Sequence, residues 1–228
     1  MIDVKRDFES RVDEIELYFS FMESIMLKEA KLLYPDDSTE IFTPDISKIF
    51  KANSFLLLYN LSESCIKNAI ESIHRTLDYE RVGYDDLKGG IKKEIIKFLK
   101  SNVKVDDFIS GVSIVAYDIV IQCFDSEKLL SGNLDARKVR DLALKYGFSC
   151  STSPMSSAGQ FTHIDSNNLL TVKTRRNDLA HGTYSFKECG KDYTIQDLTL
   201  IKNHVVAYLR QILDNIENYI LEKGYLLN

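Results

Sequence analysis

Apolar side chains recur every three to four residues along most of the chain, which is the spacing of helices rather than the alternation of strands. The pattern predicts a first helix from about Val4 to Leu33 and a second from about Ile46 to Asp78, with Asp45 as a plausible N-cap. Residues 91–100 predict a third helix. The segment 106–124 is apolar and rich in β-branched residues, so it fits a helix or a strand, and the helices on either side favour a helix.

Start and stop signals mark one more short helix in the middle of the chain. Asp135 is a good N-cap residue and Gly147 follows the last apolar position, so a helix is expected between them. Residues 149–163 are rich in Ser, Thr and Gly and predict a surface loop. The region 130–165 therefore reads as an insertion or irregular connector.

Two more helices are expected near the end of the chain. One runs from Asp165 or Ser166 to Gly182, and Thr194 with Asp197 three residues later forms a capping-box start for the other. This last helix is expected to end at about Lys223, and its apolar side chains form one stripe: Leu198, Ile201, Val205, Leu209, Ile212, Ile216 and Ile220. The pattern as a whole predicts an all-α fold with one domain over residues 1–228.

Composition and charge narrow the class of protein. The 228 residues are 44% hydrophobic and 28% charged, as in soluble globular proteins, and no apolar run approaches twenty residues, so no membrane helix is expected. The N-terminus is charged and amphipathic, unlike a secretory signal, and the four cysteines show no metal-ligand spacing. We expect a cytoplasmic protein with reduced thiols and no metal or cofactor. The net charge of −5 argues against non-specific coating of nucleic acid, but it leaves room for a local cationic cleft.

The stretch TRRNDLAHG, residues 174–182, carries the main candidate chemistry. On a helix Asn177 and His181 share a face, whereas Arg176 lies about 140° from His181 around the axis. Imidazole exchanges protons near neutral pH, and the guanidinium fork matches phosphate oxygens. A proton carrier, a phosphate clamp and a polar orienting group are what metal-free cleavage of RNA needs, with the ribose 2′-OH as nucleophile. The alternative is a solvated helix end whose histidine only serves the last carbonyls.

A polar stripe on the second predicted helix is the other unusual feature. Asn60, Glu63, Ser64 and Lys67 fall at helical spacing in the otherwise apolar LLLYNLSESCIKNAI. In one interpretation the helix itself or Lys67 satisfies these groups. In the other, the stripe lines a cleft opposite the RRNDLAH helix, with Asn60 and Glu63 orienting Arg176 or His181.

Three segments together resemble a known family. RNDLAH is similar to the Arg–polar–x3–His signature of the HEPN superfamily of prokaryotic ribonucleases and RNA-associated helical domains. LYNLSES (58–64), GNLDARKVR (132–140) and RNDLAHGTYSFKE (176–188) resemble, in order, three motifs of a stand-alone HEPN-like nuclease family. The resemblance runs from about Phe50 to the C-terminus.

The resemblance implies a helical bundle that dimerises so that two signatures face each other. It implies a metal-independent endoribonuclease of a toxin–antitoxin, abortive-infection or restriction-linked defence system, with a possible antitoxin or defence-system partner protein. Arg176 and His181 would be the catalytic pair, Asn177 the polar residue that orients them, and Glu63 with Asn60 their support. Dimerisation would also let Arg176 of one subunit work with His181 of the other.

Further cations are candidates for contacts with RNA phosphates. They are Lys173 and Arg175 beside the signature, and Arg137, Lys138 and Arg140 on the short basic helix. For that helix, a solvated face balanced by Asp135 and Asp141 is at least as good an interpretation.

Three functions stay open from the sequence. The first is a homodimeric endoribonuclease that acts as a toxin or anti-phage effector. The second is a non-catalytic module that binds RNA or nucleotide, or serves as a subunit of a larger defence complex. The third is a purely structural helical protein, for which the stripe at Asn60 and Glu63 would be exposed.

Overall fold

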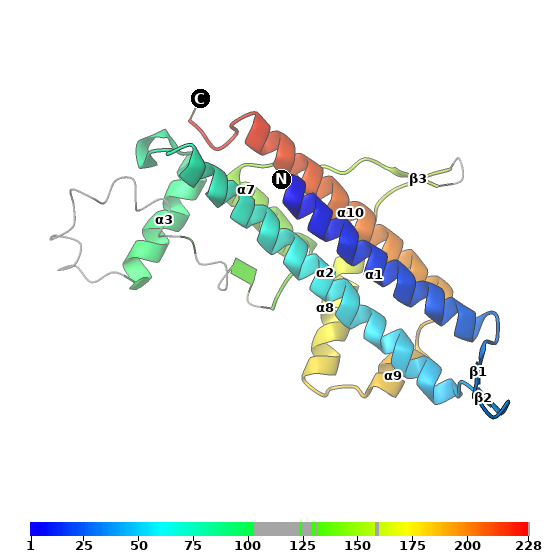
Figure 1. Ribbon diagram of the computed structural model, residues 1–228. Coiled ribbons are helices and arrows are strands. Elements are labelled where there is room, and N and C mark those ends of the chain that lie inside the picture. Colours follow the sequence, from blue (N-terminus) through cyan, green and yellow to red (C-terminus); the bar gives the residue numbers. More distant parts are fainter. Residues whose placement is uncertain (103–123, 125–128, 131, 158–159, 228) are drawn as a thin grey trace.

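Three long helices lie side by side and form the main layer of the molecule (Figure 1). The computed structural model describes residues 1–102, 124, 129–130, 132–157 and 160–227. The long helices are α1 (Ile2–Met26), α2 (Pro44–Tyr79) and α10 (Ile195–Leu221). Each packs against the other two, and their facing sides carry the apolar core. Phe55, Leu58 and Ile66 of α2 are fully buried there.

Four shorter α-helices pack against this three-helix layer in the described part of the chain. They are α3 (Gly89–Asn102), α7 (Ala136–Tyr146), α8 (Asn167–Ala180) and α9 (Phe186–Lys191), and a 3₁₀ turn, η1 (Tyr84–Asp86), precedes α3. Helices α8 and α9 contact α2, and α7 contacts α3 and α8. Gly190 lets α9 approach α2 closely, because a Cβ there would lie 1.9 Å from the backbone oxygen of Lys48. Helix α2 is therefore the element on which α1, α8, α9 and α10 assemble.

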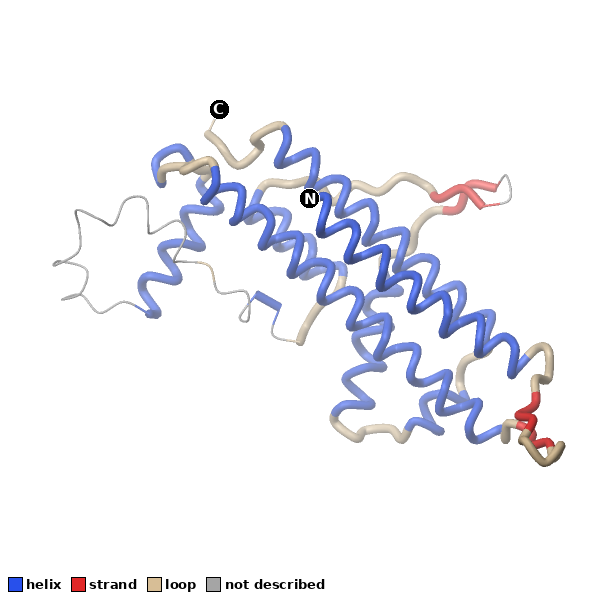
Figure 2. The backbone as a smooth tube through the Cα atoms, in the orientation of Figure 1, coloured by secondary structure: helices blue, strands red, loops and turns tan. Residues whose placement is uncertain are grey.

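In the described residues, the strands form two small hairpins within the connections between helices (Figure 2). β1 (Lys31–Leu33) pairs antiparallel with β2 (Thr39–Ile41), and β3 (Met155–Ser157) pairs antiparallel with β4 (Gln160–Thr162). Every residue of β1 and β2 is exposed. The expected all-α fold is confirmed, and so is the irregular connector before α8, although it holds the second hairpin.

The first predicted helix is too long and the second begins at a different cap. Helix α1 ends at Met26, and the chain turns at Glu29, whose φ is +51°. Leu27, Leu32 and Leu33 continue the apolar composition of the helix, but all three are exposed and so give no packing energy to extend it. Thr43, not Asp45, is the N-cap of α2, because Pro44 occupies the first helical position.

Other helix ends agree with their sequence signals. Asp135 caps α7 and Gly147 ends it with a φ of +93°, while Thr194 and Asp197 form the expected capping box of α10. The apolar stripe of α10 is buried except at Ile220, which is half-buried. The short helix α9 was not expected. Apart from Phe124, the segment 106–124 lies outside the described residues. None of the described helices is long and apolar enough to cross a membrane.

Candidate functional site

Helix α8 ends in a turn that depends on glycine and places His181 at the C-terminus of the helix. Gly182 has a φ of +69°. Its N–H donates to the Leu179 oxygen at 3.3 Å, and the Thr183 N–H donates to the Asp178 oxygen at 2.9 Å. This pair of bonds is the Schellman motif, which needs a residue in the left-handed region and therefore favours glycine. The predicted stop at Gly182 is confirmed, and His181 is the C-cap residue.

The His181 side chain points to solvent. Its backbone N–H stays in the helix and donates to the Asn177 oxygen at 2.9 Å. The residue is exposed, and within the described part of the chain no hydrogen bond holds its ring. An imidazole at the surface is accessible to a ligand or to a second protein chain.

Arg176 instead reaches across to α2 and is half-buried. Its Cζ lies 4.2 Å from the centre of the Tyr59 ring, and its Nη1 donates to Asn177 Oδ1 at 2.9 Å. Nη1 and Nη2 also lie 3.5 and 3.8 Å from the point where Gly132 would carry a Cβ. We call these three neighbours, Tyr59, Gly132 and Asn177, the Arg176 cage. They are uncharged, and among the described residues no carboxylate forms an ion pair with Arg176, so its charge is not neutralised there.

A hydrogen bond at its hydroxyl fixes Tyr59 in place. The ring is almost fully buried, and the hydroxyl oxygen accepts the Leu134 N–H at 3.2 Å. Burial raises the pKa of Tyr59, the Leu134 N–H opposes that shift, and the nearby Glu63 carboxylate, one helical turn further along α2, adds to it. The phenol is therefore neutral.

The beginning of α7 is tied to α8 by an ion pair. One oxygen of Asp135 accepts the Lys138 N–H at 2.9 Å as the helix N-cap, and the other accepts from Lys173 Nζ at 2.5 Å. Burial would raise the pKa of Asp135, but the bonds from Lys173 and the Lys138 N–H outweigh it and lower the pKa below its ordinary value. Lys173 lies one turn before Arg176 on α8. The pair thus holds the segment that begins at Gly132 against the Arg176 helix.

The three sequence segments that suggested a family therefore meet in space. Tyr59 and Glu63 come from the first segment, Gly132 and Leu134 from the second, and Arg176 from the third. More than seventy residues separate Tyr59 from Leu134, and about forty separate Gly132 from Arg176. The guanidinium is the point at which they converge.

The structure divides the polar stripe of α2. Glu63 is half-buried, and its carboxylate lies close enough to Tyr59 to raise the pKa of the phenol. Asn60 is exposed on the side that faces α1, where its Oδ1 accepts from Arg11 Nη1 at 3.2 Å. The Ser64 hydroxyl donates to the Leu61 oxygen of its own helix at 3.1 Å. Of the two supporting residues expected from the sequence, Glu63 lies near Tyr59 of the Arg176 cage, whereas Asn60 contacts α1 instead.

The cations beside the signature already have partners in the fold. Arg175 donates to the Tyr193 hydroxyl at 2.9 Å and to Asp178 at 3.3 Å, and its Cζ lies 5.8 Å from the centre of the Tyr184 ring. Lys173 is paired with Asp135. These contacts fix α8 and the loop after it, so a role in binding RNA would have to compete with them.

The basic side chains of α7 are more open. Arg137 and Arg140 are exposed and Lys138 is half-buried. They lie on the helix that begins beside the Arg176 cage, and their role in binding RNA stays a prediction.

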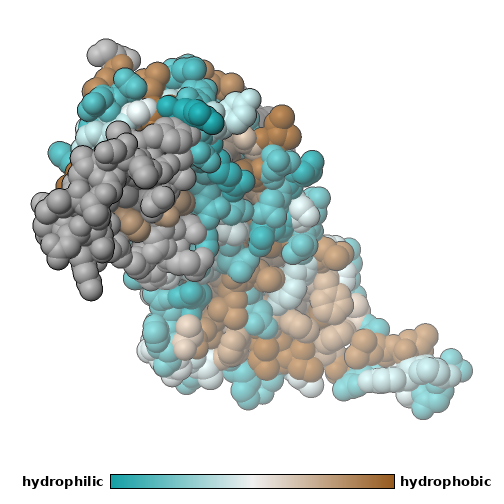
Figure 3. All heavy atoms as spheres, turned by 60° about the vertical axis from the view of Figure 1, so that its left-hand side comes forward, coloured by the Kyte–Doolittle hydropathy of each residue, from teal (hydrophilic) through white to brown (hydrophobic). Residues whose placement is uncertain are grey.

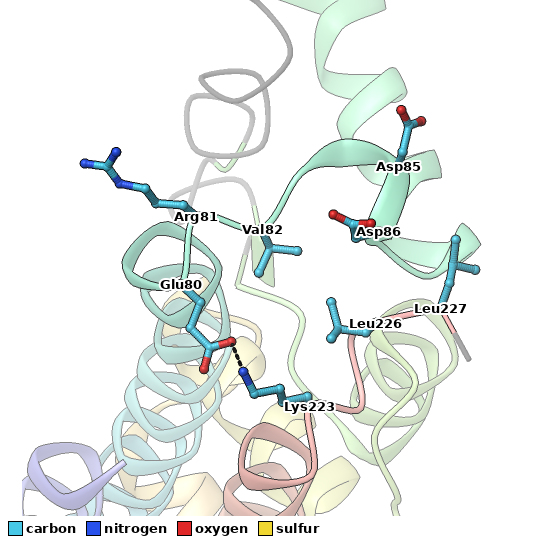
Figure 4. Close-up of a pocket in the computed structure, with 8 residues that line it drawn as sticks. All are labelled: Glu80, Arg81, Val82, Asp85, Asp86, Lys223, Leu226 and Leu227. Atoms are coloured by element: carbon cyan, nitrogen blue, oxygen red, sulfur yellow. Dashed lines mark hydrogen bonds and ion pairs between the residues drawn. The ribbon is translucent and has the colours of Figure 1, made fainter.

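A separate pocket lies far from this site. A pocket of about 360 Å³ lies where α2 ends, lined by Glu80, Asp85, Asp86 and Lys223 among others, with Glu80 paired to Lys223 (Figure 4). It is about 30 Å along α2 from Tyr59, at 1.5 Å per residue, and holds no residue expected in the site from the sequence. Nowhere in the described ranges do three His, Cys, Asp or Glu side chains group as metal ligands would.

The sequence interpretation missed three parts of the site: Tyr59, Gly132 and the Leu134 N–H. Each lies inside one of the segments that resemble the family motifs, next to polar residues that drew attention instead. A tyrosine in an apolar helix is expected to pack in the core. Only the fold shows that the Tyr59 ring also contacts the Arg176 guanidinium. The glycine carried a signal, because GN before an N-cap aspartate is typical of a turn.

A comparison with known protein families matches residues 3–225 to the HEPN_MAE_28990-like HEPN family. No curated protein and no solved structure matches the chain. HEPN-type domains are helical bundles that are generally associated with nuclease activity or RNA, in agreement with the fold and with the segments gathered at Arg176. The match spans nearly the whole sequence, and the chain belongs to the HEPN_MAE_28990-like HEPN family.

Proposed function

We propose that this protein is a metal-independent endoribonuclease that acts as a homodimer with a composite Arg176–His181 active site. The observation that carries the proposal is the Arg176 cage. Three separated segments of the chain hold one guanidinium among uncharged groups, five residues before an exposed histidine at the end of the same helix.

The cage suits a phosphate. A half-buried guanidinium with neutral neighbours keeps its full charge, and its planar fork matches two phosphate oxygens. In the proposed reaction Arg176 stabilises the negative charge that grows on the phosphoryl oxygens, and Asn177 holds Nη1 in place. The 2′-OH attacks the adjacent phosphorus, the O5′–P bond breaks, and the 5′-oxygen leaves with a proton.

Two histidines would complete the proton transfers. One imidazole takes the proton of the 2′-OH, and a second protonates the leaving 5′-oxygen. A single chain offers one exposed histidine at this site, His181, so the pair is best supplied by a dimer in which both α8 ends face a shared groove. The proposal therefore includes the dimer.

Exposed apolar side chains on α1 and α2 support subunit pairing. Ile49 and Leu57 on the outer side of α2 are 38% and 36% exposed, and Leu17 and Phe21 of α1 are 74% and 47% exposed. Figure 3 shows apolar residues gathered in the lower half of the molecule, toward the β1–β2 hairpin. Leu57 lies about 200° around α2 from Tyr59, so these side chains are on the side of α2 away from the cage. Exposed apolar side chains that gather on one face are typical of interfaces.

The test combines RNA cleavage in EDTA with the oligomeric state. Wild type is expected to cleave a 5′-labelled random-sequence RNA pool in EDTA, and Arg176→Ala and His181→Ala are expected to lower the rate by at least about a hundredfold. Both variants should stay folded and dimeric by circular dichroism and light scattering. Mixing the two inactive variants should restore little activity, because a mixed dimer holds a single His181 and the proposed reaction uses two.

Two control variants test whether the loss of cleavage is specific to Arg176 and His181. His163→Ala removes another exposed histidine, and Arg6→Ala removes an exposed arginine on α1. Both are expected to cleave at the wild-type rate. A wild type that cuts only when a divalent metal is present, or that is strictly monomeric while active, would contradict the proposal.

The alternative function is a HEPN module that binds its ligand without catalysing a reaction. Asn60 is exposed, and Arg175 and Lys173 are held in internal contacts, which also suits a non-catalytic HEPN module that binds RNA or a partner protein. Such a module would bind the RNA pool without cutting it, and binding would survive His181→Ala.

We further propose a cytoplasmic role as a toxin or anti-phage effector. Induced expression of the wild-type chain should arrest bacterial growth, whereas expression of His181→Ala should not. Growth that is unaffected by an actively cleaving wild type would argue against that role while leaving the nuclease proposal intact.

A further inference from the structure

Tyr59 is a buried aromatic residue that serves a cation as well as the core. Its ring is 3% exposed, and the Arg176 Cζ lies over it at 4.2 Å from the centre. At this distance the cation meets the negative face of the ring, and partial desolvation strengthens the attraction. The contact joins α2 to α8 at the residue proposed to bind phosphate.

The contact leaves the hydrogen-bonding edge of the guanidinium available. A guanidinium carries five N–H donors in its own plane, whereas an aromatic ring engages its face. In the described contacts only one group, Asn177 Oδ1, accepts from those donors. A ring under the face can therefore fix the direction of the arginine without consuming the donors that a phosphate needs.

We propose that Tyr59 is a positioning residue, which aims the Arg176 guanidinium at the RNA phosphate through its ring. This inference rests on the proposed function. Without the ring, the long arginine side chain would sample several rotamers, and part of the binding energy would be lost in ordering it when the transition state forms.

The tyrosine is itself held in place. The Leu134 N–H donates to its hydroxyl oxygen at 3.2 Å, and the ring is packed in the core. Leu134 lies two residues after Gly132, whose φ of +68° turns the chain beside Nη1. The Leu134 N–H and the core therefore set the position of the ring, and the ring sets that of Arg176.

The first experiment measures the position of Arg176 directly and needs no cleavage. Side-chain Nε–Hε signals of arginine are recorded by ¹H–¹⁵N NMR, and Arg176→Lys identifies the signal of interest. A hydrogen over an aromatic face is shifted upfield, so Tyr59→Leu should move the Arg176 signal downfield and Tyr59→Phe should keep most of the shift. An Arg176 signal that does not move in Tyr59→Leu would overturn the inference.

The second experiment asks whether position matters for the reaction. On the random-sequence RNA pool, Tyr59→Leu is expected to lower kcat about tenfold with little change in KM, and Tyr59→Phe to lower it less than about threefold, since it retains the cation–π contact. In the Arg176→Ala background, Tyr59→Leu should cost almost nothing more. A loss that simply adds to that of Arg176→Ala would show a general structural defect and overturn the inference.

Phe19→Leu is the matched control. Phe19 is also a buried ring under a cation, with Lys202 Nζ 5.2 Å from its centre, and it lies on α1 rather than in the Arg176 cage. Its loss should destabilise the core without changing kcat, and a kcat as low as that of Tyr59→Leu would count against the inference. If wild type cuts no RNA, the proposed function fails, and the NMR result for Tyr59→Leu still decides whether the ring positions Arg176.

Discussion

Asp135 and Lys173 join two segments that are 38 residues apart, with 2.5 Å between the Asp135 Oδ2 and the Lys173 Nζ. Both side chains are largely shielded, at 13% and 20% exposure. Because the same aspartate caps α7, one side chain ends the turn at Gly132, starts a helix and attaches that helix to α8. The geometry of the Arg176 cage depends on this attachment.

Removing the Asp135 carboxylate should destabilise the protein. Asp135→Ala loses the helix cap and leaves Lys173 shielded without its partner, so we expect a loss of about 2–3 kcal/mol in the free energy of unfolding. Asp135→Asn keeps a capping oxygen and should lose about 1 kcal/mol. Urea denaturation followed by circular dichroism measures both, and equal losses in the two variants would assign the whole effect to charge.

The same carboxylate should give the protein an acid-sensitive component of stability. The folded state lowers the pKa of Asp135 below its ordinary value of 3.8, so its stabilising contribution is complete above that value and disappears as pH falls through the lower, folded pKa. The difference in unfolding free energy between wild type and Asp135→Asn should therefore be constant from pH 7 to about pH 5 and shrink below pH 4. A constant difference down to pH 2 would contradict it.

His74 should contribute a separate pH dependence at higher pH. Its ring stacks on Phe124 at 3.9 Å, and Nε2 lies 2.8 Å from the Tyr146 hydroxyl. Nδ1 is buried and has no hydrogen-bond partner within the described residues. Burial lowers the pKa of His74 from 6.5 to about 4, so protonation favours the unfolded state.

Stability that depends on neutral His74 should be complete above pH 6.5 and be lost as pH falls toward 4. The loss is about 3 kcal/mol at most. His74→Leu should remove this slope whatever its effect on stability at pH 8, and urea titrations at half-unit pH intervals test it. A slope that persists in His74→Leu would assign the effect to other groups.

Gly182 should stabilise the protein only through its left-handed backbone conformation. A Cβ at Gly182 would meet no atom within 4 Å, but the φ of +69° is strained for other residues, so Gly182→Ala should cost about 1 kcal/mol. Gly89→Ala is the control, because a Cβ there also meets open space and its φ is not in the left-handed region. Thermal unfolding should show no loss for Gly89→Ala, and equal losses at both sites would remove the argument.

The chemistry proposed for the site predicts the ends of its products. Attack by the 2′-OH leaves a 2′,3′-cyclic phosphate on one fragment and a 5′-hydroxyl on the other. Fragments should therefore accept label from polynucleotide kinase without prior phosphatase treatment. Fragments with 5′-phosphates would point to attack by water instead.

Much of the fold is readable in the sequence where a local signal and core packing agree. Caps at Asp135 and Thr194 and the stop at Gly182 are local chemistry, and they fall where the helices begin and end. The predicted end of α1 was wrong because Leu27, Leu32 and Leu33 extended the apolar pattern into a segment whose leucines are exposed. Helix α9 was missed although Ser185 and Glu188 form a capping box, because six residues give no periodicity to detect.

The candidate site was readable only in part. Arg176, Asn177 and His181 stand out by charge and spacing, and the structure shows where each lies. The contact between Tyr59 and Arg176 depends on how α2 and α8 cross, and no spacing along one helix contains that information. The bond from Asn60 to Arg11 of α1 was out of reach for the same reason.

The Schellman turn has a consequence for the proposed catalytic pair. Because Arg176 and His181 belong to one uninterrupted stretch of α8 that closes at Gly182, their offset along the axis is fixed at about 7.5 Å by the rise of the helix. No hinge between them can adjust it. A single inserted residue would turn the imidazole by about 100° around the axis, so the direction of His181 relative to Arg176 in each subunit is set by the helix itself.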